Sequence, residues 1–428
     1  MADLEELENA QSTDAGGVPA VEAPPNEVTA AVVEAPVEPP VEAPVEPAAP
    51  DTAEEFVPVS VVDEVLARIA DEEAAEPPTE PEPAEIATSK SDSRAILVRL
   101  RPAGPWRIGP DSGDRDRVDR VYHSDSLYSA VCGAMLRMGW LEEWLAATAT
   151  ATGAPAVRFS SCFPFHANTL YVIPPRHLWP PAAGSSKVRW KGATFVPTSV
   201  VEALVAGETP REDGWLIDNE CLVPVGAGGG LFRASVRSGA AVDRDGAGVA
   251  AHSAACLEFT PQSGLWFVIS FANDGAREQW SERVKAVVRL LADSGFGGKR
   301  SQGWGHAEAP EFVEGTLPNL VLKKRAKSGE TAHWLLSSYH PSDADGVDWG
   351  RGNYAIATRS GRVESSAGWG EMKKPARMVT EGSVVVSAAA PQGSATNVAP
   401  ENFAHPVYRA GFAVSIPVPL APKGKASS

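Results

Sequence analysis

The chain has 428 residues, a formal net charge of −17 and 43% hydrophobic residues, which suits two or three domains with buried cores. No apolar run approaches the roughly eighteen residues of a membrane span, and the acidic start MADLEELENA is unlike the basic start of a signal peptide. The four cysteines lie far apart without a CxxC pair, which argues against a zinc knuckle or a disulfide framework. We therefore expect a cytoplasmic protein without membrane contact, bound metal or other cofactor.

The charge is unevenly distributed along the chain. Residues 1–90 carry a net charge of −21 and fourteen prolines, whereas residues 91–428 carry +4. Such a polar, proline-rich segment cannot bury enough apolar surface to offset its ordering entropy, so we predict a disordered acidic tail over residues 1–90. Within it, Ser60 to Ala75 has helical apolar spacing, which fits either a helix that docks on a partner or a fluctuating helix. The mildly basic body remains compatible with a polyanionic partner.

The ordered body is expected to begin near Arg94. Residues 95–100 are predicted to form a strand, and a charged loop follows at 111–117. A helix is expected from Ser124, with Ser124 or Asp125 accepting the free N–H groups of its first turn.

Strands and loops are predicted over residues 155–265, followed by a strand at 266–271. A helix over 277–293 has a clear apolar face, and Gly295 is expected to end it. After a basic linker at 323–327, a second and strand-rich unit begins.

This order of elements favours an α+β fold of two ferredoxin-like (RRM-like, βαββαβ) domains over a Rossmann sheet. We place the first domain at residues 91–322. The second, more irregular domain is placed at residues 328–422.

The glycine-rich loop at residues 295–305 is the most informative segment. Its glycines allow close approach to a ligand, and its N–H groups can form an anion-binding nest charged by two basic residues. A Walker or dinucleotide loop would precede a helix, whereas this loop follows one. We favour binding of an RNA phosphate backbone over a flexible turn. The candidate residues are Gly297, Gly298, Lys299, Arg300, Ser301, Gln302, Gly303 and Gly305.

Basic residues elsewhere are further candidates for RNA contact. Arg107 lies beside Trp106 in the sequence. Lys187, Arg189 and Lys191 alternate with other residues, which would place them on one face of a strand. That strand would be either an RNA-binding face or a solvated edge.

Several of these motifs resemble a known family. Residues 297–305 resemble the glycine-rich signature of the RAMP proteins of CRISPR effectors, in which such a loop follows the second helix of a ferredoxin-like domain. Residues 123–130 resemble the first-helix motif of that family, and residues 226–260 its projecting "thumb" hairpin. Motifs between residues 335 and 409 are similar to the fourth subunit of the type III-A (Csm) effector. The resemblance covers about residues 94–420 and leaves out the tail.

The resemblance implies a role without catalysis. That subunit holds the 5′ repeat tag of the CRISPR RNA and docks on the large cyclase/polymerase-like subunit and on a backbone RAMP subunit. Its thumb wedges the guide–target duplex and so meets target RNA. The implied RNA contacts in the first-helix motif are His123, Ser124, Asp125, Ser126 and Tyr128. The implied thumb contacts are Arg237, Val242, Asp243 and Arg244.

The alternative is an endoribonuclease of the same superfamily. In related backbone subunits a corresponding loop carries an Asp for metal-dependent cleavage, a part that Asp114 or Asp116 would play. In the CRISPR-RNA processing relatives a histidine is the general base, which would be His123. A glycine-containing loop with interleaved arginines is a poor frame for metal ligands, and a histidine before a helix is more often structural. We therefore expect a non-catalytic RNA-binding subunit.

Overall fold

The computed structural model describes residues 94–420, apart from short gaps at 111–112, 182–189, 228, 243–245, 247, 324–330 and 366–367. The predicted tail over residues 1–90, with the segment from Ser60 to Ala75, lies outside the described residues.

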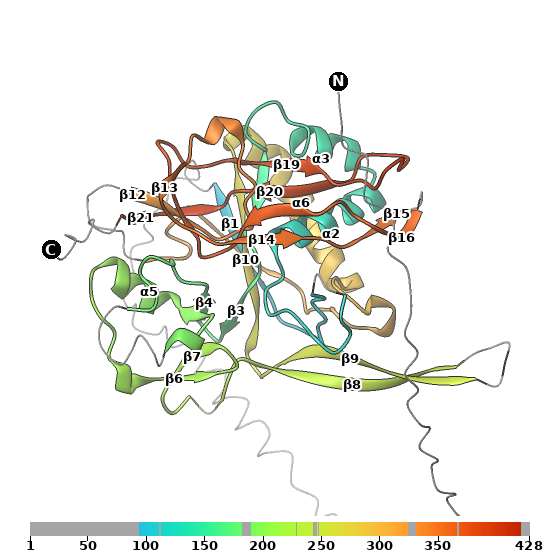
Figure 1. The fold of residues 1–428 in the computed structure, drawn as a ribbon, viewed down its shortest axis with the longest axis horizontal. Helices are drawn as coiled ribbons and strands as arrows, with labels where there is room; N and C mark the ends of the chain where they lie inside the picture. The colour runs from blue at the N-terminus through green and yellow to red at the C-terminus, as the bar shows by residue number, and fades with distance from the viewer. Residues whose placement is uncertain are drawn as a thin grey trace, which may run out of the picture. The chain divides into compact units, whose positions relative to one another are not determined.

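A seven-stranded antiparallel sheet forms the first part of the fold (Figure 1). Its strand order is β11-β1-β10-β3-β4-β5, and β2 pairs separately with β10. The strands are β1 (Ala95–Leu100), β2 (Val157–Phe159), β3 (Phe163–His166), β4 (Thr169–Val172), β5 (Val196–Pro197), β10 (Ser263–Phe271) and β11 (Glu311–Gly315). The continuous apolar run of β1 follows from its place between two neighbours with both faces covered.

Two long helices pack against each other and on this sheet (Figure 1). They are α2 (Ser124–Arg137) and α6 (Asp274–Ser294), while the shorter helices are α3 (Leu141–Ala147) and α5 (Thr198–Val205). The predicted apolar face of α6 is buried, and Gly295 ends the helix at φ 75° as expected. The elements β1, α2, β2, β10, α6 and β11 follow one another in the chain with further strands and helices between them, and the βαββαβ assignment of the first domain stays a prediction. No helix among the described residues is long and apolar enough to cross a membrane.

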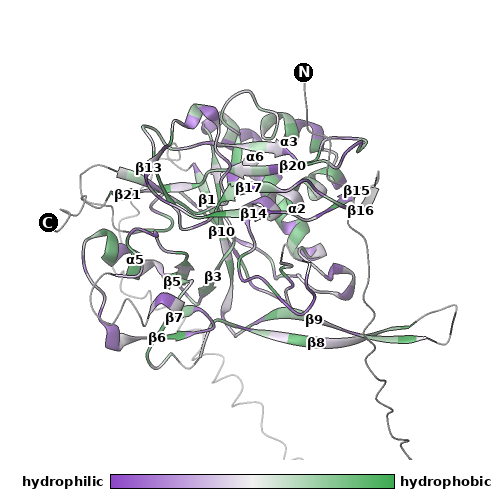
Figure 2. Ribbon diagram, viewed as in Figure 1, coloured by the Kyte–Doolittle hydropathy of each residue, from purple (hydrophilic) through white to green (hydrophobic). Residues whose placement is uncertain are grey.

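A long hairpin leaves the sheet at the expected place. Strands β8 (Phe232–Val242) and β9 (Val249–Phe259) pair over eleven residues, and the hairpin projects from the body in Figure 1. Its outer part is exposed, including the apolar side chains of Val236, Val242 and Val249. Figure 2 shows apolar stretches along it. The short ribbon of β6 (Trp215–Asp218) and β7 (Cys221–Pro224) belongs to the same insertion.

The C-terminal part consists of strands. One sheet has the order β13-β18-β12-β21, and three two-stranded ribbons accompany it. The sheet strands are β12 (Thr331–Leu335), β13 (Asp348–Asn353), β18 (Val384–Val386) and β21 (Ser415–Pro419). The ribbons are β14 (Ile356–Arg359) with β17 (Ala376–Val379), β15 (Arg362–Ser365) with β16 (Gly368–Met372), and β19 (Gly393–Asn397) with β20 (Tyr408–Phe412).

The second βαββαβ unit is not found as predicted. Between residues 331 and 420 the described chain contains strands and one 3₁₀ turn but no α-helix. Helix α2 of the first part packs against β20 instead, so this helix contacts both the first sheet and the ribbon β19–β20. The rings of Tyr128 and Phe412 meet edge to face at 5.6 Å, and a single large apolar core contains residues of both parts. The domain boundary between residues 322 and 328 stays a prediction.

Candidate nucleic-acid interface

The glycine-rich loop at residues 295–305 depends on glycine where it makes close approaches. At Gly305 a Cβ atom would lie 2.1 Å from the carbonyl oxygen of Phe296, and φ is 82°. At Gly297 it would lie 2.7 Å from the carbonyl oxygen of Arg107, at φ 88°. No other L-residue fits these positions without moving the backbone. The loop is therefore fixed in shape, unlike the flexible turn that was the alternative.

The tip of this loop presents unused hydrogen-bond donors. Gln302 and Gly303 donate their N–H groups to the carbonyls of Lys299 and Arg300. The N–H groups of Lys299, Arg300 and Ser301 have no acceptor among the residues that the structure describes. Lys299 is half-buried in the left-handed region at φ 64°, while the side chains of Arg300, Ser301 and Gln302 are exposed. Three consecutive free N–H groups beside two cations fit the predicted anion-binding nest.

Arg300 has a partner on another element. Its Nη2 forms an ion pair with Oε1 of Glu364 on β15, and both side chains are partly exposed. The hairpin β15–β16 is thereby tied to the glycine-rich loop. The Arg300 guanidinium, which we expect to bind phosphate, is thus already paired with the Glu364 carboxylate.

Arg107 corrects one sequence prediction. Its guanidinium donates to the carbonyl oxygens of Asp114 and Ala255, each at 2.7 Å, and to those of Arg115 and Arg117 at 2.9 and 3.3 Å. The residue is buried, and this burial lowers the pKa of the guanidinium. Arg107 therefore joins the charged loop to β9, and it is not the exposed RNA-binding arginine that we expected.

The first-helix motif also lies in the interior. Ser124, Asp125 and Tyr128 are buried, and the Tyr128 hydroxyl lies 2.7 Å from the Thr148 hydroxyl. His123, the residue before the helix, makes no side-chain cap. The predicted cap is wrong, because Ser124 Oγ instead accepts the N–H of residue 338 at 3.0 Å.

Asp125 forms the centre of a buried charge cluster. Its carboxylate pairs with Arg359 at 3.2 Å and with Arg409. Burial opposes the charged carboxylate, but the two guanidinium groups outweigh it and lower the pKa of Asp125. Ser126 lies at the edge of this cluster, 3.3 Å from Arg359. Asp125 is thus engaged within the protein, which contradicts its predicted contact with RNA.

A second buried network surrounds Glu381. His123 Nδ1 lies 2.8 Å from its Oε1, which also accepts hydrogen bonds from the hydroxyls of Ser161 and Ser338. Burial disfavours the imidazolium, yet the charge and hydrogen bond of Glu381 prevail and raise the pKa of His123. Burial would raise the pKa of Glu381, but the charge and hydrogen bond of His123 and the hydrogen bond from Ser161 lower it to about 2. His123 therefore retains its proton more firmly than a free histidine, which opposes a role as general base.

The basic segment near residue 190 is only partly described. Lys187 and Arg189 lie outside the described residues. Lys191 is exposed on a 3₁₀ turn, Trp190–Gly192, and not on the face of a strand. The strand prediction is wrong at this position because the Trp190 side chain is buried, with its ring stacked 5.5 Å from that of Trp179.

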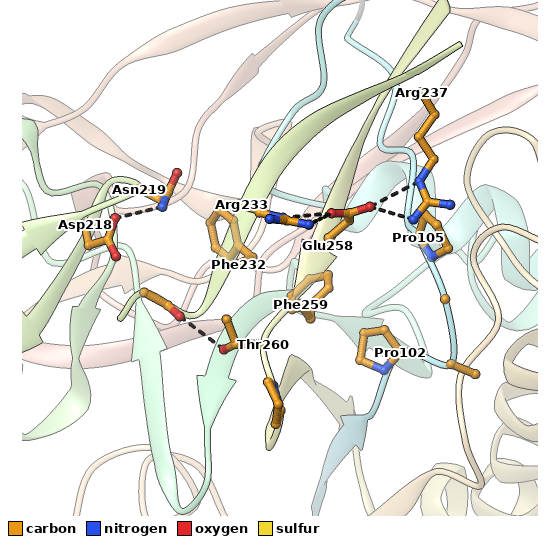
Figure 3. Close-up of a pocket in the computed structure, with 14 residues that line it drawn as sticks. Pro102, Pro105, Asp218, Asn219, Phe232, Arg233, Arg237, Glu258, Phe259 and Thr260 are labelled. Carbon is orange, nitrogen blue, oxygen red and sulfur yellow. Dashed lines mark hydrogen bonds and ion pairs between the residues drawn. The ribbon is translucent and has the colours of Figure 1, made fainter. Parts of the chain in front are cut away.

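The base of the hairpin β8–β9 forms a cleft of about 690 Å³ that sequence reasoning missed (Figure 3). Glu258 lies between two arginines, 2.7 Å from Arg233 and 2.6 Å from Arg237. Hydrogen bonds from Arg237 and Arg233 lower the pKa of Glu258. Farther out, Val242 is exposed, while Asp243 and Arg244 lie outside the described residues. The available sequence signal for this cleft was the pair of arginines four residues apart on β8, which places both on one face of the strand.

The residues of the endoribonuclease alternative occupy ordinary structural positions. Asp116 Oδ1 accepts a hydrogen bond from the Ser253 hydroxyl at 2.6 Å, and the carbonyl of Asp114 accepts one from Arg107. In the described part of the chain, no group of three or more His, Cys, Asp or Glu side chains is placed to hold a metal ion.

Comparison with known proteins bears on these observations. Residues 328–418 match the family model of the CRISPR Csm4 C-terminal domain. A search of curated proteins found no match. A chain of the "Csm3-Csm4 subcomplex in the type III-A CRISPR-Cas interference complex" superposes with a TM-score of 0.51 and 17% identity, covering 76% of this chain and 100% of that chain. A chain of the "Csm1-Csm4 cassette in complex with pppApA" gives 0.46 and 18%, with 77% and 99% covered. The superposition on the chain of the Csm3–Csm4 subcomplex shows a shared fold.

Proposed function

We propose that the protein is the type III-A CRISPR effector subunit that holds the 5′ tag of the CRISPR RNA, from the premise that residues 328–418 match the family model of the Csm4 C-terminal domain. The glycine-rich loop carries this proposal. Its tip combines three free N–H groups with Lys299 and Arg300, which is the set of donors that grips RNA phosphates without reading the bases.

The proposed partners have different support. A backbone RAMP subunit is supported by the shared fold with the Csm3–Csm4 subcomplex. The large cyclase/polymerase-like subunit follows from the resemblance of the sequence motifs. Contact of the hairpin β8–β9 with the guide–target duplex is supported by its projection from the body and its exposed valines. A cytoplasmic location stays a prediction.

We propose a binding role without catalysis. The two residue types that the endoribonuclease alternative needs are already engaged, since His123 is paired with Glu381 and Asp116 is bonded to Ser253. Turnover of bound RNA by the full chain, lost in Asp114→Ala, Asp116→Ala or His123→Ala, would revive the alternative.

Removal of the two loop cations tests RNA binding. The variant Lys299→Ala with Arg300→Ala should weaken binding of single-stranded RNA. The slope of log K against log salt should fall by about 1.4, at roughly 0.7 per phosphate contact. Arg176→Ala with Arg211→Ala is the matched control, because both arginines are exposed and neither belongs to the loop at residues 295–305. Equal salt slopes for the loop variant and the wild-type chain would contradict the proposal.

A further inference from the structure

The cleft at the base of the hairpin β8–β9 is separate from the glycine-rich loop. It is lined by residues at the start of β8 and at the end of β9, by the turn of β6–β7 and by the segment 102–105 (Figure 3). Its volume of about 690 Å³ falls within the roughly 300–1,000 Å³ of pockets that hold small molecules. A site of this size accommodates one nucleotide.

One wall of the cleft is cationic. Arg233 and Arg237 each direct Nε and Nη2 to Glu258. Their side chains are 74% and 51% exposed. One carboxylate against two guanidinium groups leaves a net charge of +1 on this wall, and Asp218 elsewhere in the lining brings the sum over the cleft to zero. Because Glu258 holds both arginines in place, they form a preorganised site for an anion such as phosphate.

Another part of the wall is apolar. The half-buried ring of Phe259 packs against Phe232 at 5.8 Å, which fixes its orientation. Pro102 and Pro105 also line the cleft, to the right of Phe259 in Figure 3. A fixed aromatic ring next to cations is the usual platform on which RNA-binding proteins stack a base.

The segment 102–105 connects the cleft to the glycine-rich loop. The N–H of Gly305 donates to the carbonyl of Pro105 at 2.9 Å, and the N–H of Ala103 donates to that of His306 at 3.0 Å. The end of the loop, at Gly305 and His306, therefore contacts a segment that also lines the cleft.

We propose that the cleft binds one nucleotide of single-stranded RNA, with its phosphate on Arg233 and Arg237 and its base against Phe259. The half-buried Asp218 faces the cleft from the turn of β6–β7. Its negative charge repels phosphate from that side and favours a base edge that donates hydrogen bonds. The inference rests on the proposed function, because the same strand is held at the glycine-rich loop.

Photocrosslinking of the full chain tests this assignment. The probes are 12-nucleotide single-stranded RNAs with one 4-thiouridine at successive positions, and the crosslinked peptides are identified by mass spectrometry. One position, or two adjacent ones, should crosslink to residues 102–105 or 258–261. Arg233→Gln with Arg237→Gln should abolish this crosslink and lower the salt slope by about 0.7, the loss of one phosphate contact. Arg176→Gln with Arg211→Gln should retain it. Thermal unfolding of both variants confirms that they fold.

The outcomes separate this inference from the proposed function. If RNA binds through Lys299 and Arg300 but no position crosslinks to the cleft, the cleft assignment is overturned and the proposed function stands. A crosslink that survives in the Arg233 and Arg237 variant also overturns it. If the wild-type chain binds none of the RNAs, both proposals fail.

Discussion

At the scale of single residues, the buried carboxylate of Asp125 is important for stability, because it balances the charges of both Arg359 and Arg409. Asp125→Asn would remove the carboxylate that two buried guanidinium groups share. Breaking such a pair typically costs about 3–5 kcal/mol in the free energy of unfolding. Urea denaturation should show a loss of this size, against a negligible change for Asp213→Asn at an exposed site. A similar, small effect of both variants would contradict the cluster's structural role.

The pair of His123 and Glu381 predicts a pH dependence of stability. The pKa of Glu381 is lowered to about 2, so its contribution is present above pH 4.5 and is lost as the pH falls below that value. The pKa of His123 is raised despite its burial, with Asp125 adding to and Arg359 opposing the effect of Glu381. The contribution of His123 is therefore present below pH 6.5 and is lost as the pH rises through the raised value.

The pair should accordingly stabilise the fold most between pH 4.5 and 6.5. Unfolding of the wild-type chain and of His123→Gln, measured from pH 3 to 9, should differ most in that window. A difference that does not change with pH would show that the histidine acts through packing alone.

At the scale of elements, the contact between the glycine-rich loop and the hairpin β15–β16 predicts competition with RNA. Glu364→Gln frees Arg300, so RNA affinity should increase by a factor of about 1.4 to 5, which corresponds to the roughly 0.2–1 kcal/mol of an exposed ion pair. Glu371→Gln is the control, since it removes the same charge from the same hairpin. Equal gains for the two variants would show that only net charge matters.

The elements with local signals were predictable from the sequence. The bounds of β1, the apolar face of α6 and the helix end at Gly295 follow from patterns within a few residues. The hydrogen bond that Ser124 makes in place of a helix cap was not predictable, because its partner lies more than two hundred residues away. The 3₁₀ turn at Trp190 was missed because the alternation of basic residues does not show that the Trp190 ring stacks on Trp179.

The candidate site was predictable in part for the same reason. The close approaches that require glycine in the loop have a sequence signature, whereas burial of Arg107 does not. A basic residue that holds four carbonyls has the same appearance in a sequence as one that holds phosphate. Likewise, the cleft beside Phe259 arises only when the hairpin, the β6–β7 turn and the segment 102–105 meet.

At the scale of the whole molecule, the described residues share one large core that extends from the first sheet through α2 to β20. The first-helix motif accordingly joins two parts of the protein, and the glycine-rich loop is left as the main element of the proposed RNA site. Loss of the loop cations should then remove RNA without separating the two sheets or disturbing contacts with partner subunits.

Purification from the native host tests the central claim most directly. The chain, tagged at its C-terminus, is isolated at moderate salt, its RNA is sequenced and its partner chains are identified. Our account predicts short RNAs with one shared 5′ end, together with a large cyclase-like subunit and a backbone subunit. The variant Lys299→Ala with Arg300→Ala should lose much of the RNA and keep its fold. A wild-type chain that emerges without RNA and without partners would contradict the account.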